Sequence, residues 1–122
     1  AIGSNGTVLW SRYGWAGARM GSAFAAVGDL NGDGRPETMV SAPTTVSTTF
    51  GYVGAFASQT GQPLTAVNGS SNGQWGASMV TLGDIDGDGD DDGACSEPLY
   101  AGGIGRVSLI RPITGGAASV YW

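Results

Sequence analysis

An acidic stretch that occurs twice constrains this chain more than any other feature. Residues 28–43 read GDLNGDGRPETMVSAP, and residues 83–98 read GDIDGDGDDDGACSEP. Each copy has oxygen-bearing side chains at the first, third, fifth and ninth positions of a short loop. Equivalent positions lie 55 residues apart in all five pairs: Asp29 and Asp84, Asn31 and Asp86, Asp33 and Asp88, Glu37 and Asp92, Pro43 and Pro98. The sequence therefore predicts two copies of one structural unit.

The spacing of these side chains suits a hard divalent cation. Calcium takes roughly 6–8 oxygen ligands, and a loop surrounds it when alternate side chains turn inward and a glycine relieves the sharp bend. Gly34 and Gly89 occupy that bend. A solvated acidic turn would use the same residue types, but the repetition of register and spacing favours a metal loop. We therefore expect two calcium sites.

An EF-hand is the obvious competing interpretation, and the sequence argues against it. That motif requires a bidentate glutamate at its twelfth position, where this chain has Val40 and Cys95. The flanking residues are short and run into Pro43 and Pro98, which is typical of strands closed by a turn. Each acidic loop is therefore predicted to connect two antiparallel strands.

Composition favours a folded chain. The 122 residues include 23 glycines, but a hydrophobic fraction of 41% is too high for disorder. Nine of the ten acidic residues lie in the loops, so two calcium ions would change the net charge from −5 to about −1 (−5 plus 4). The five basic residues, all arginines, are scattered, which excludes a nucleic-acid surface.

Cys95 is the single cysteine and is expected to be a buried thiol. We expect a soluble chain without a membrane span or signal peptide, already processed if secreted.

The hydrophobic pattern predicts an all-β fold of two four-stranded antiparallel units. A polar leader, 1–5, precedes repeat 1 (6–60) and repeat 2 (61–122). Residues 6–10 are expected to form an extra strand before the first metal loop, and residues 11–19 a loop. The expected strands of the two units are 20–28 and 75–83, 37–42 and 92–97, 50–56 and 105–110, and 62–67 and 116–122.

These features resemble the FG-GAP repeat of integrin α-subunit β-propellers. The resemblance rests on the two loops, on Met20-Gly21 and Trp75-Gly76 where the family has Phe-Gly, on Ser41-Ala42-Pro43 where it has Gly-Ala-Pro, and on Gly51-Tyr52-Val53 and Gly105-Arg106-Val107 where it has Gly-x-Val. It implies two propeller-like blades, each with a calcium-binding hairpin. The implied ligands are Asp29, Asn31, Asp33, the Arg35 carbonyl and Glu37, and Asp84, Asp86, Asp88, the Asp90 carbonyl and Asp92.

Two blades cannot close a propeller, which usually has ~4–8 of them. Because each blade buries a face by stacking on a neighbour, this chain is expected to need a partner for its uncovered sheet faces. Three chains in a six-bladed ring or many in a filament would satisfy that need, as would a longer propeller of which this chain is a fragment. A two-blade sandwich is the remaining arrangement.

The first functional hypothesis is an extracellular, calcium-stabilised structural or adhesive module that associates with itself, with surface proteins or with glycans. Millimolar extracellular calcium keeps loops of modest affinity filled. Asn5 and Asn68 begin sequons that permit glycosylation in a secretory route. The chain has no histidine or lysine, and its acids are mostly committed to the loops, so we expect no catalysis.

A carbohydrate-binding module is the second hypothesis. Aromatic side chains in loops stack on sugar faces, although such residues more often pack between blades. The candidates are Tyr13, Trp15, Trp75 and Tyr100.

Overall fold

The chain folds into two antiparallel sheets joined by a short connection. The computed structural model describes residues 2, 4–46, 49–112 and 119–120. Each sheet follows the order of the chain and has four strands, which confirms the predicted all-β class. The first sheet contains β1 (Phe24–Val27), β2 (Glu37–Val46), β3 (Thr49–Phe56) and β4 (Pro63–Asn68), and the second contains β5 (Met79–Gly83), β6 (Asp92–Glu97), β7 (Arg106–Arg111) and β8 (Ser119–Val120).

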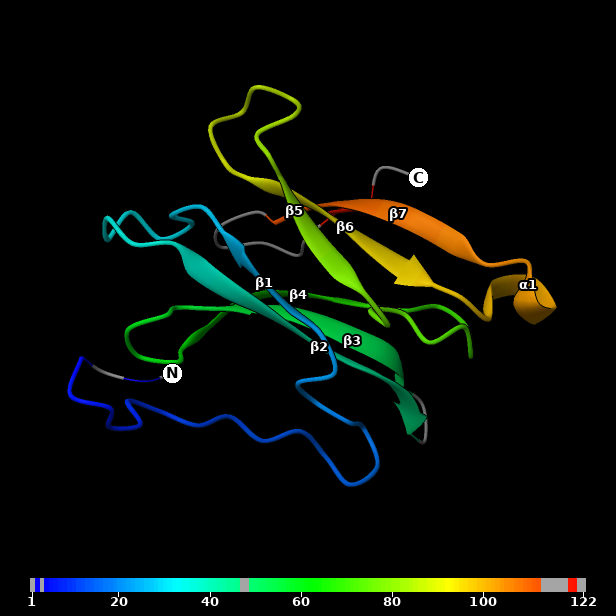
Figure 1. Cartoon of the computed structure of the whole chain (residues 1–122). Coiled ribbons are helices and arrows are strands. Elements are labelled where there is room, and N and C mark those ends of the chain that lie inside the picture. Colours follow the sequence, from blue (N-terminus) through cyan, green and yellow to red (C-terminus); the bar gives the residue numbers. More distant parts are fainter. Residues whose placement is uncertain (1, 3, 47–48, 113–118, 121–122) are drawn as a thin grey trace.

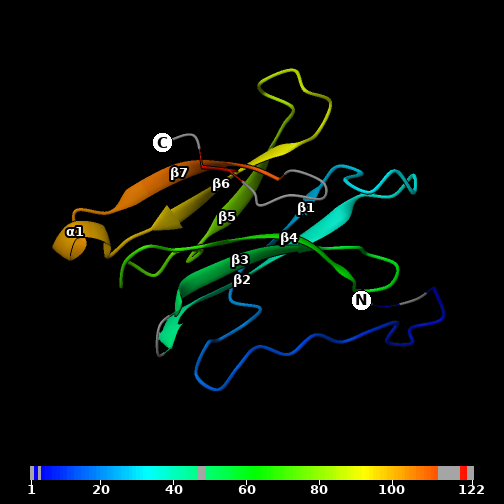
Figure 2. The same ribbon diagram turned by 180° about the vertical axis from the view of Figure 1, so that it is seen from behind.

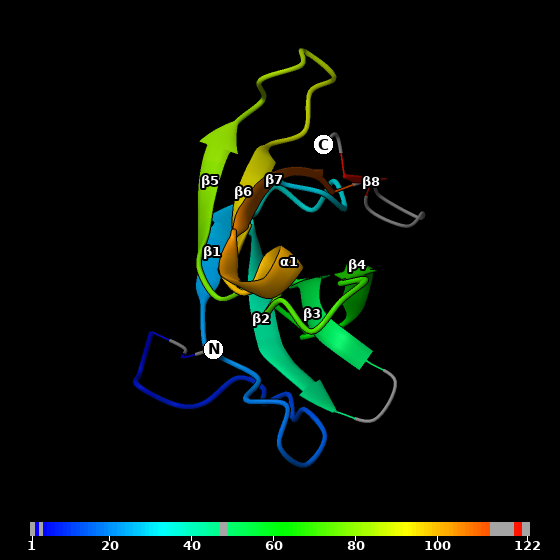
Figure 3. The same ribbon diagram turned by 90° about the vertical axis from the view of Figure 1, so that its right-hand side faces the viewer.

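The two sheets lie beside one another with their first strands adjacent (Figures 1 and 3). Figure 3 shows β1 next to β5 on one side of the molecule and β4 and β8 on the other. The Thr81 hydroxyl on β5 donates a hydrogen bond to the Ala26 carbonyl on β1 and links the sheets directly. Figure 2 shows the same two layers from behind.

The hydrophobic core lies between the sheets and draws on both. Met39 and Val53 from the first sheet pack in one cluster with Trp75, Cys95 and Ile110 from the second half, and each of the five is at most 3% exposed. Burying these side chains stabilises the fold by roughly 1.5–3 kcal/mol each. The expectation that Cys95 is buried is confirmed.

Glycines allow Trp75 to approach the first sheet closely. The residue forms an isolated parallel bridge with Gly51. A Cβ atom added at Gly51 would lie 2.8 Å from the Trp75 carbonyl oxygen, and one added at Gly69 would lie 2.8 Å from the Trp75 Cβ atom. Real Cβ atoms are almost never that close, so larger residues at these two positions would push the sheets apart.

The first strand of each sheet begins later than predicted, because a tight corner precedes it. Arg19 and Gln74 have φ values of 57° and 63°, and Gly21 and Gly76 have values of 92° and 83°. Two left-handed residues so close together interrupt the extended backbone that a regular strand needs. We call residues 19–21 and 74–76 the first and second corners; in each, the glycine N–H donates a hydrogen bond to the carbonyl of Ser41 or Ser96, at 2.8 Å and 3.0 Å.

The predicted strand at residues 6–10 is wrong. Val8 forms an isolated bridge with Ile2, and the segment otherwise lies outside the sheets. Side chains attach it to the first sheet instead: the Trp10 indole N–H donates to the Ser58 carbonyl at 2.7 Å, and Arg12 Nε donates to the Gly61 carbonyl at 2.6 Å. Residues 4–15, here called the arm, therefore run along the side of the first sheet away from the second (Figures 1 and 3).

Other boundaries shift by a few residues. The first sheet ends at Asn68, so the predicted repeat 61–122 includes its last strand. The predicted loop 44–49 is shorter, because β2 extends to Val46 and β3 begins at Thr49. The second-half connection contains a helical turn, α1 (Tyr100–Gly103). Of the predicted strand 116–122, β8 is the described part, and residues 116–118 and 121–122 lie outside the described residues.

Replacing Trp75 with alanine tests whether this packing holds the two sheets together. We expect Trp75→Ala to lower the free energy of unfolding by about 3–5 kcal/mol, because it leaves a large cavity at the sheet junction. Urea denaturation measures the change. Tyr13→Ala removes an aromatic side chain that is 88% exposed and should change stability by less than about 0.5 kcal/mol. Equal effects of both variants would contradict the role given to Trp75.

Candidate metal centres

Both acidic loops are turns of β-hairpins, as predicted. The first connects β1 to β2, and the second connects β5 to β6 (Figure 1). Strands on both sides of each loop also exclude the helix–loop–helix frame of an EF-hand. The loops lie at the same end of the molecule, since a Cβ atom added at Gly28 would be 3.1 Å from Asp91 Cγ.

The two loops have the same internal hydrogen bonds. In each, the first aspartate accepts backbone N–H groups from three residues of the loop, at 2.6–3.0 Å. The third-position and fifth-position side chains also each accept the N–H group two residues further on. These bonds curl the backbone so that the acidic side chains converge.

In the first loop the converging oxygens come from three carboxylates. Ligand atoms of Asp29, Asp33 and Glu37 lie within 4.8 Å of one another. Glu37 is 1% exposed, and its Oε2 atom accepts the Leu30 N–H at 2.7 Å. Asn31 is also close, because its Nδ2 atom donates to Glu37 Oε1 at 3.4 Å. All four predicted side-chain ligands of this loop are therefore neighbours.

In the second loop, a different set of positions supplies the three converging carboxylates. Asp84, Asp86 and Asp88 lie within 4.8 Å of one another, and Asp92 is not part of that group. The aspartate is one methylene shorter than the equivalent Glu37. Its Oδ2 atom accepts the Ile85 N–H at 3.0 Å, and its buried Oδ1 atom has no hydrogen-bond partner among the described residues.

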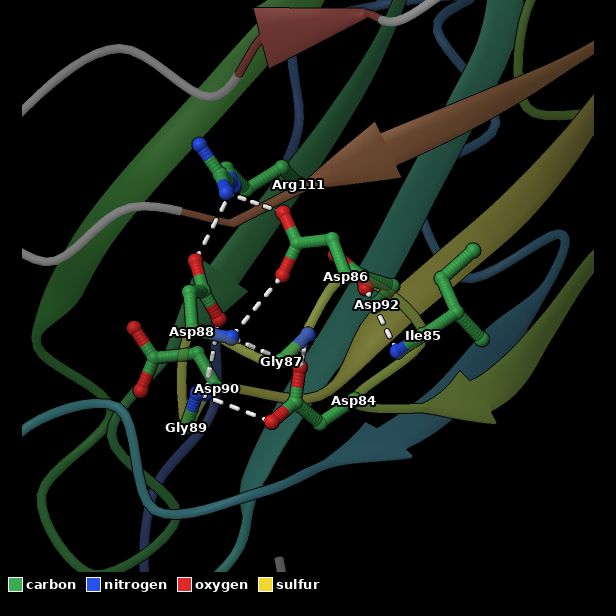
Figure 4. Close-up of polar contacts among 9 residues, drawn as sticks. All are labelled: Asp84, Ile85, Asp86, Gly87, Asp88, Gly89, Asp90, Asp92 and Arg111. Atoms are coloured by element: carbon green, nitrogen blue, oxygen red, sulfur yellow. Dashed lines mark hydrogen bonds and ion pairs between the residues drawn. The ribbon is translucent and has the colours of Figure 1, made fainter.

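Arg111 contacts the second loop from the end of β7. Its guanidinium forms ion pairs with Asp86 and with Asp88, the latter at 3.0 Å (Figure 4). The sequence alone did not indicate a role for this arginine. The two repeats do differ at this position, because the residue equivalent to Arg111, directly after β3, is Ala57. Arg111 therefore neutralises part of the charge of one loop and has no counterpart in the other.

Burial and mutual repulsion disfavour ionisation at the ninth position of both loops. Burial, with repulsion from Asp33 and Asp29, raises the pKa of Glu37. Burial, with repulsion from Asp86 and Asp88, also raises the pKa of Asp92. The pKa of Asp29 is lowered, because the Gly34 N–H and other loop amides donate to it. A cation at either loop would relieve the repulsion.

The seventh residue was predicted to contribute only its backbone carbonyl. The Arg35 and Asp90 N–H groups donate to Asp33 and Asp88, which places both residues in the curl of the loop. The Arg35 side chain is exposed. Burial and the neighbouring aspartates raise the pKa of the Asp90 side chain.

The donor set of both loops fits calcium. Carboxylates and one amide oxygen are hard ligands, which this ion prefers. The unpartnered Oδ1 atom of Asp92 adds a buried acceptor in the second loop. In the first loop a bound ion would be held by Asp29, Asp33 and Glu37 and would cross-link the start of the loop to β2; in the second loop Asp84, Asp86 and Asp88 would hold it.

The four aromatic candidates do not gather at one site. Trp75 is 1% exposed and belongs to the core, whereas Tyr13 is 88% exposed in the arm. Trp15 packs edge-on against Tyr52, with ring centroids 5.9 Å apart. Tyr100 lies under the Arg106 guanidinium at 4.0 Å. The structure therefore brings none of the four candidates together in a common groove.

Both sequons lie at the surface. Asn5 is exposed, and its Oδ1 atom accepts hydrogen bonds from the backbone and the hydroxyl group of Thr7, at 3.2 Å and 2.6 Å. Asn68 is exposed at the end of β4.

Glu97 is a buried residue whose role the sequence did not reveal. It is fully buried and pairs with Arg106, whose Nη2 atom lies 2.6 Å from Glu97 Oε2. Ser71, in the connection between the sheets, donates to Glu97 Oε1 at 2.8 Å. The equivalent residue of repeat 1 is Ala42. Glu97 therefore attaches the connection to β6 and is not a free acid.

Comparison with known proteins finds similarity to integrin α-subunits. An alignment of 108 residues is 35% identical to integrin alpha-3 from Cricetulus griseus, and the same values hold for integrin alpha-3 from Mus musculus. It covers 82% of this chain and 10% of each relative, so the chain spans about a tenth of their length. No family model matches the chain. Among the described residues, no helix is long and apolar enough to cross a membrane.

The pKa values predict opposite responses to acid with and without calcium. The raised pKa values of Glu37 and Asp92 mean that the metal-free folded state binds protons more tightly than the unfolded chain. Its stability should therefore rise as the pH falls from neutral towards these raised pKa values. Asp29 does not oppose this trend there, because its pKa lies below 3.8. With calcium, protons compete with the ion, and stability should fall over the same range.

Thermal unfolding of metal-stripped and calcium-loaded protein at stepped pH measures both trends. Parallel slopes in the two series would contradict the assignment of Glu37 and Asp92 as ligands.

Removing Arg111 should strengthen calcium binding at the second loop. The Arg111→Met variant loses two ion pairs that compete with the cation for Asp86 and Asp88. We expect the affinity of this loop to rise by about two- to fivefold, the worth of an exposed ion pair. Isothermal titration calorimetry measures it. Arg35→Met removes an exposed arginine from the other loop and should leave the second loop unchanged; an unaltered titration of Arg111→Met would contradict the competition.

Proposed function

We propose that this chain is an extracellular, calcium-stabilised structural or adhesive module built from two FG-GAP-type blades. The single observation that carries the proposal is the repeated hairpin loop, in which converging carboxylates follow the same pattern of hydrogen bonds twice. The similarity to integrin alpha-3 supports an integrin-like module with divalent cations. Calcium would act at both loops as a structural cross-link.

Each calcium ion would join the two strands of a hairpin. In the first loop it would bridge Asp29, two residues after β1, and the buried Glu37, at the start of β2. The metal-free carboxylates repel one another, and this repulsion adds to burial in raising the pKa of Glu37. Extracellular calcium is concentrated enough to fill loops of modest affinity, which supports a location outside the cell or at its surface.

The proposed role is non-catalytic. Nine of the ten acidic residues belong to the two loops, and the tenth, Glu97, is engaged by Arg106 and Ser71. In this proposal the carboxylates hold metal or maintain the fold, and none serves as an acid, base or nucleophile.

We also propose that copies of this chain associate through their outer sheet faces. Both outer sheet faces carry exposed apolar residues, including Phe24 on β1 at 74%, Val80 on β5 at 53% and Val107 on β7 at 57%. A single chain leaves these faces in water, and contact with further blades would bury them. Homo-oligomerisation into a ring or a filament is the arrangement we propose.

Chelation tests the calcium role. At free calcium about ten times the dissociation constant, each filled site adds about 1.4 kcal/mol to the free energy of unfolding. Removing calcium should therefore lower the thermal midpoint by several degrees. The combined Asp33→Ala and Asp88→Ala substitutions should abolish this response, because they remove one central ligand from each loop.

Asp91→Ala is the matched control, since it removes an acid of the second loop that is not a proposed ligand. It should leave the response to chelator in place. A midpoint of the native chain that does not respond to chelator would refute the calcium role.

A further inference from the structure

We propose that the first corner of one chain docks on the outer face of the second sheet of another chain, in a head-to-tail contact. This inference rests on the proposed self-association and names the surfaces that carry it. The observation behind it is that the contact already exists once, inside the chain, between the second corner and the inner face of the first sheet.

The internal contact joins a corner to a sheet face. Gly76, in the second corner, lies so close to the first sheet that an added Cβ atom would be 2.8 Å from Ser41 Cβ and from Val53 Cγ2. Ser41 and Val53 are directly paired across β2 and β3 and are at most 3% exposed. Met39 and Ala55 form the next pair on the same face, and each is 2% exposed.

The second sheet presents the same face without a cover. The repeat places Ser96 and Val107 at the positions of Ser41 and Val53, and Ala94 and Leu109 at those of Met39 and Ala55. The strand pairing agrees, because Ser96 is paired with Val107 and Ala94 with Leu109. Val107 is nevertheless 57% exposed, against 3% for Val53. We call Ser78, Val80, Ala94, Ser96 and Val107 the acceptor face; with Met79 and Cys95 they line a groove of about 130 Å³.

The first corner has the shape of the second, but no sheet face lies against it among the described residues. Gly21 has a φ of 92°, against 83° for Gly76, and both donate to equivalent serine carbonyls. Gly76 is buried, whereas Gly21 is exposed and an added Cβ atom would meet nothing within 4 Å. Gly21 therefore has the backbone conformation that allows Gly76 to contact a sheet face, but no sheet face of the described chain contacts Gly21.

The residues around the first corner form a matching donor face. Phe24 is paired with Val40 as Met79 is paired with Cys95. Met79 packs against the inter-sheet core and Cys95 is 1% exposed, but Phe24 is 74% exposed. Met20, Gly21 and Val40 line a groove of about 280 Å³ together with residues of the arm, among them Val8, Trp10 and Arg12. Phe24, Met20, Gly21 and Val40 are the donor face.

A second copy of this chain fits both faces at once. Its donor face would meet the acceptor face as the second sheet meets the first, so the established inter-sheet interface would continue from chain to chain. Such a contact is heterologous, because different surfaces meet, and it produces a ring if its rotation closes or a filament if it does not.

Single charge substitutions on each face test the contact in calcium-loaded protein. Phe24→Asp disables the donor face and Val107→Asp disables the acceptor face. Both side chains are exposed, at 74% and 57%, so neither change disturbs the core. Analytical ultracentrifugation at micromolar concentration should show multimers of the native chain and monomers of each variant. Ile104→Asp, at a residue that is 83% exposed outside both faces, should leave the multimers intact.

Mixing the two variants gives the decisive measurement. Each retains the face that the other has lost, so an equimolar mixture should form dimers that do not grow further. Native protein that stays monomeric, multimers that survive either substitution, or a mixture that stays monomeric would overturn the proposal. Calcium titration of the same samples separates this result from the proposed metal role, because a monomer whose stability depends on calcium would refute the docking alone.

Discussion

The close approach of Trp75 and Gly76 to the first sheet is the interaction on which the rest of the structure depends. A sheet of four short strands buries too little apolar surface to be stable alone, and each sheet here gains its core from the other. Small residues at the junction make this possible, because Gly51 and Gly69 leave room for the backbone and Cβ atom of Trp75 against the neighbouring sheet. The position of the metal loops at one end follows from the same stacking.

The parts of the fold that the sequence predicted are those set by local chemistry. The acidic loops and the strands that flank them depend on residues within one hairpin, and the predicted turn at Asp29–Glu37 is confirmed. The strand at 6–10 was wrong, because Val8 and Leu9 have suitable side chains but no sheet edge beside them in the described structure. The start of β1 was predicted too early, because the left-handed conformation of Arg19 is not evident from its residue type.

Long-range contacts account for what remained hidden in the candidate site. Arg111 is more than twenty positions from Asp86, and only the folding of β7 beside β6 brings the two together. Asp92 looked equivalent to Glu37, but its shorter side chain leaves it outside the three-carboxylate group. The two loops therefore share a backbone design and differ in charge balance, a difference that the repeat pattern alone does not reveal.

Cys95 gives the inter-sheet core a property beyond packing. Burial raises the pKa of its thiol to about 12, so the reactive thiolate is scarce at neutral pH. The same burial keeps oxidants and disulfides away from the sulfur while the sheets are together. Its reaction with a thiol reagent would thus require the sheets to separate, and the rate of that reaction would report how often the interior opens.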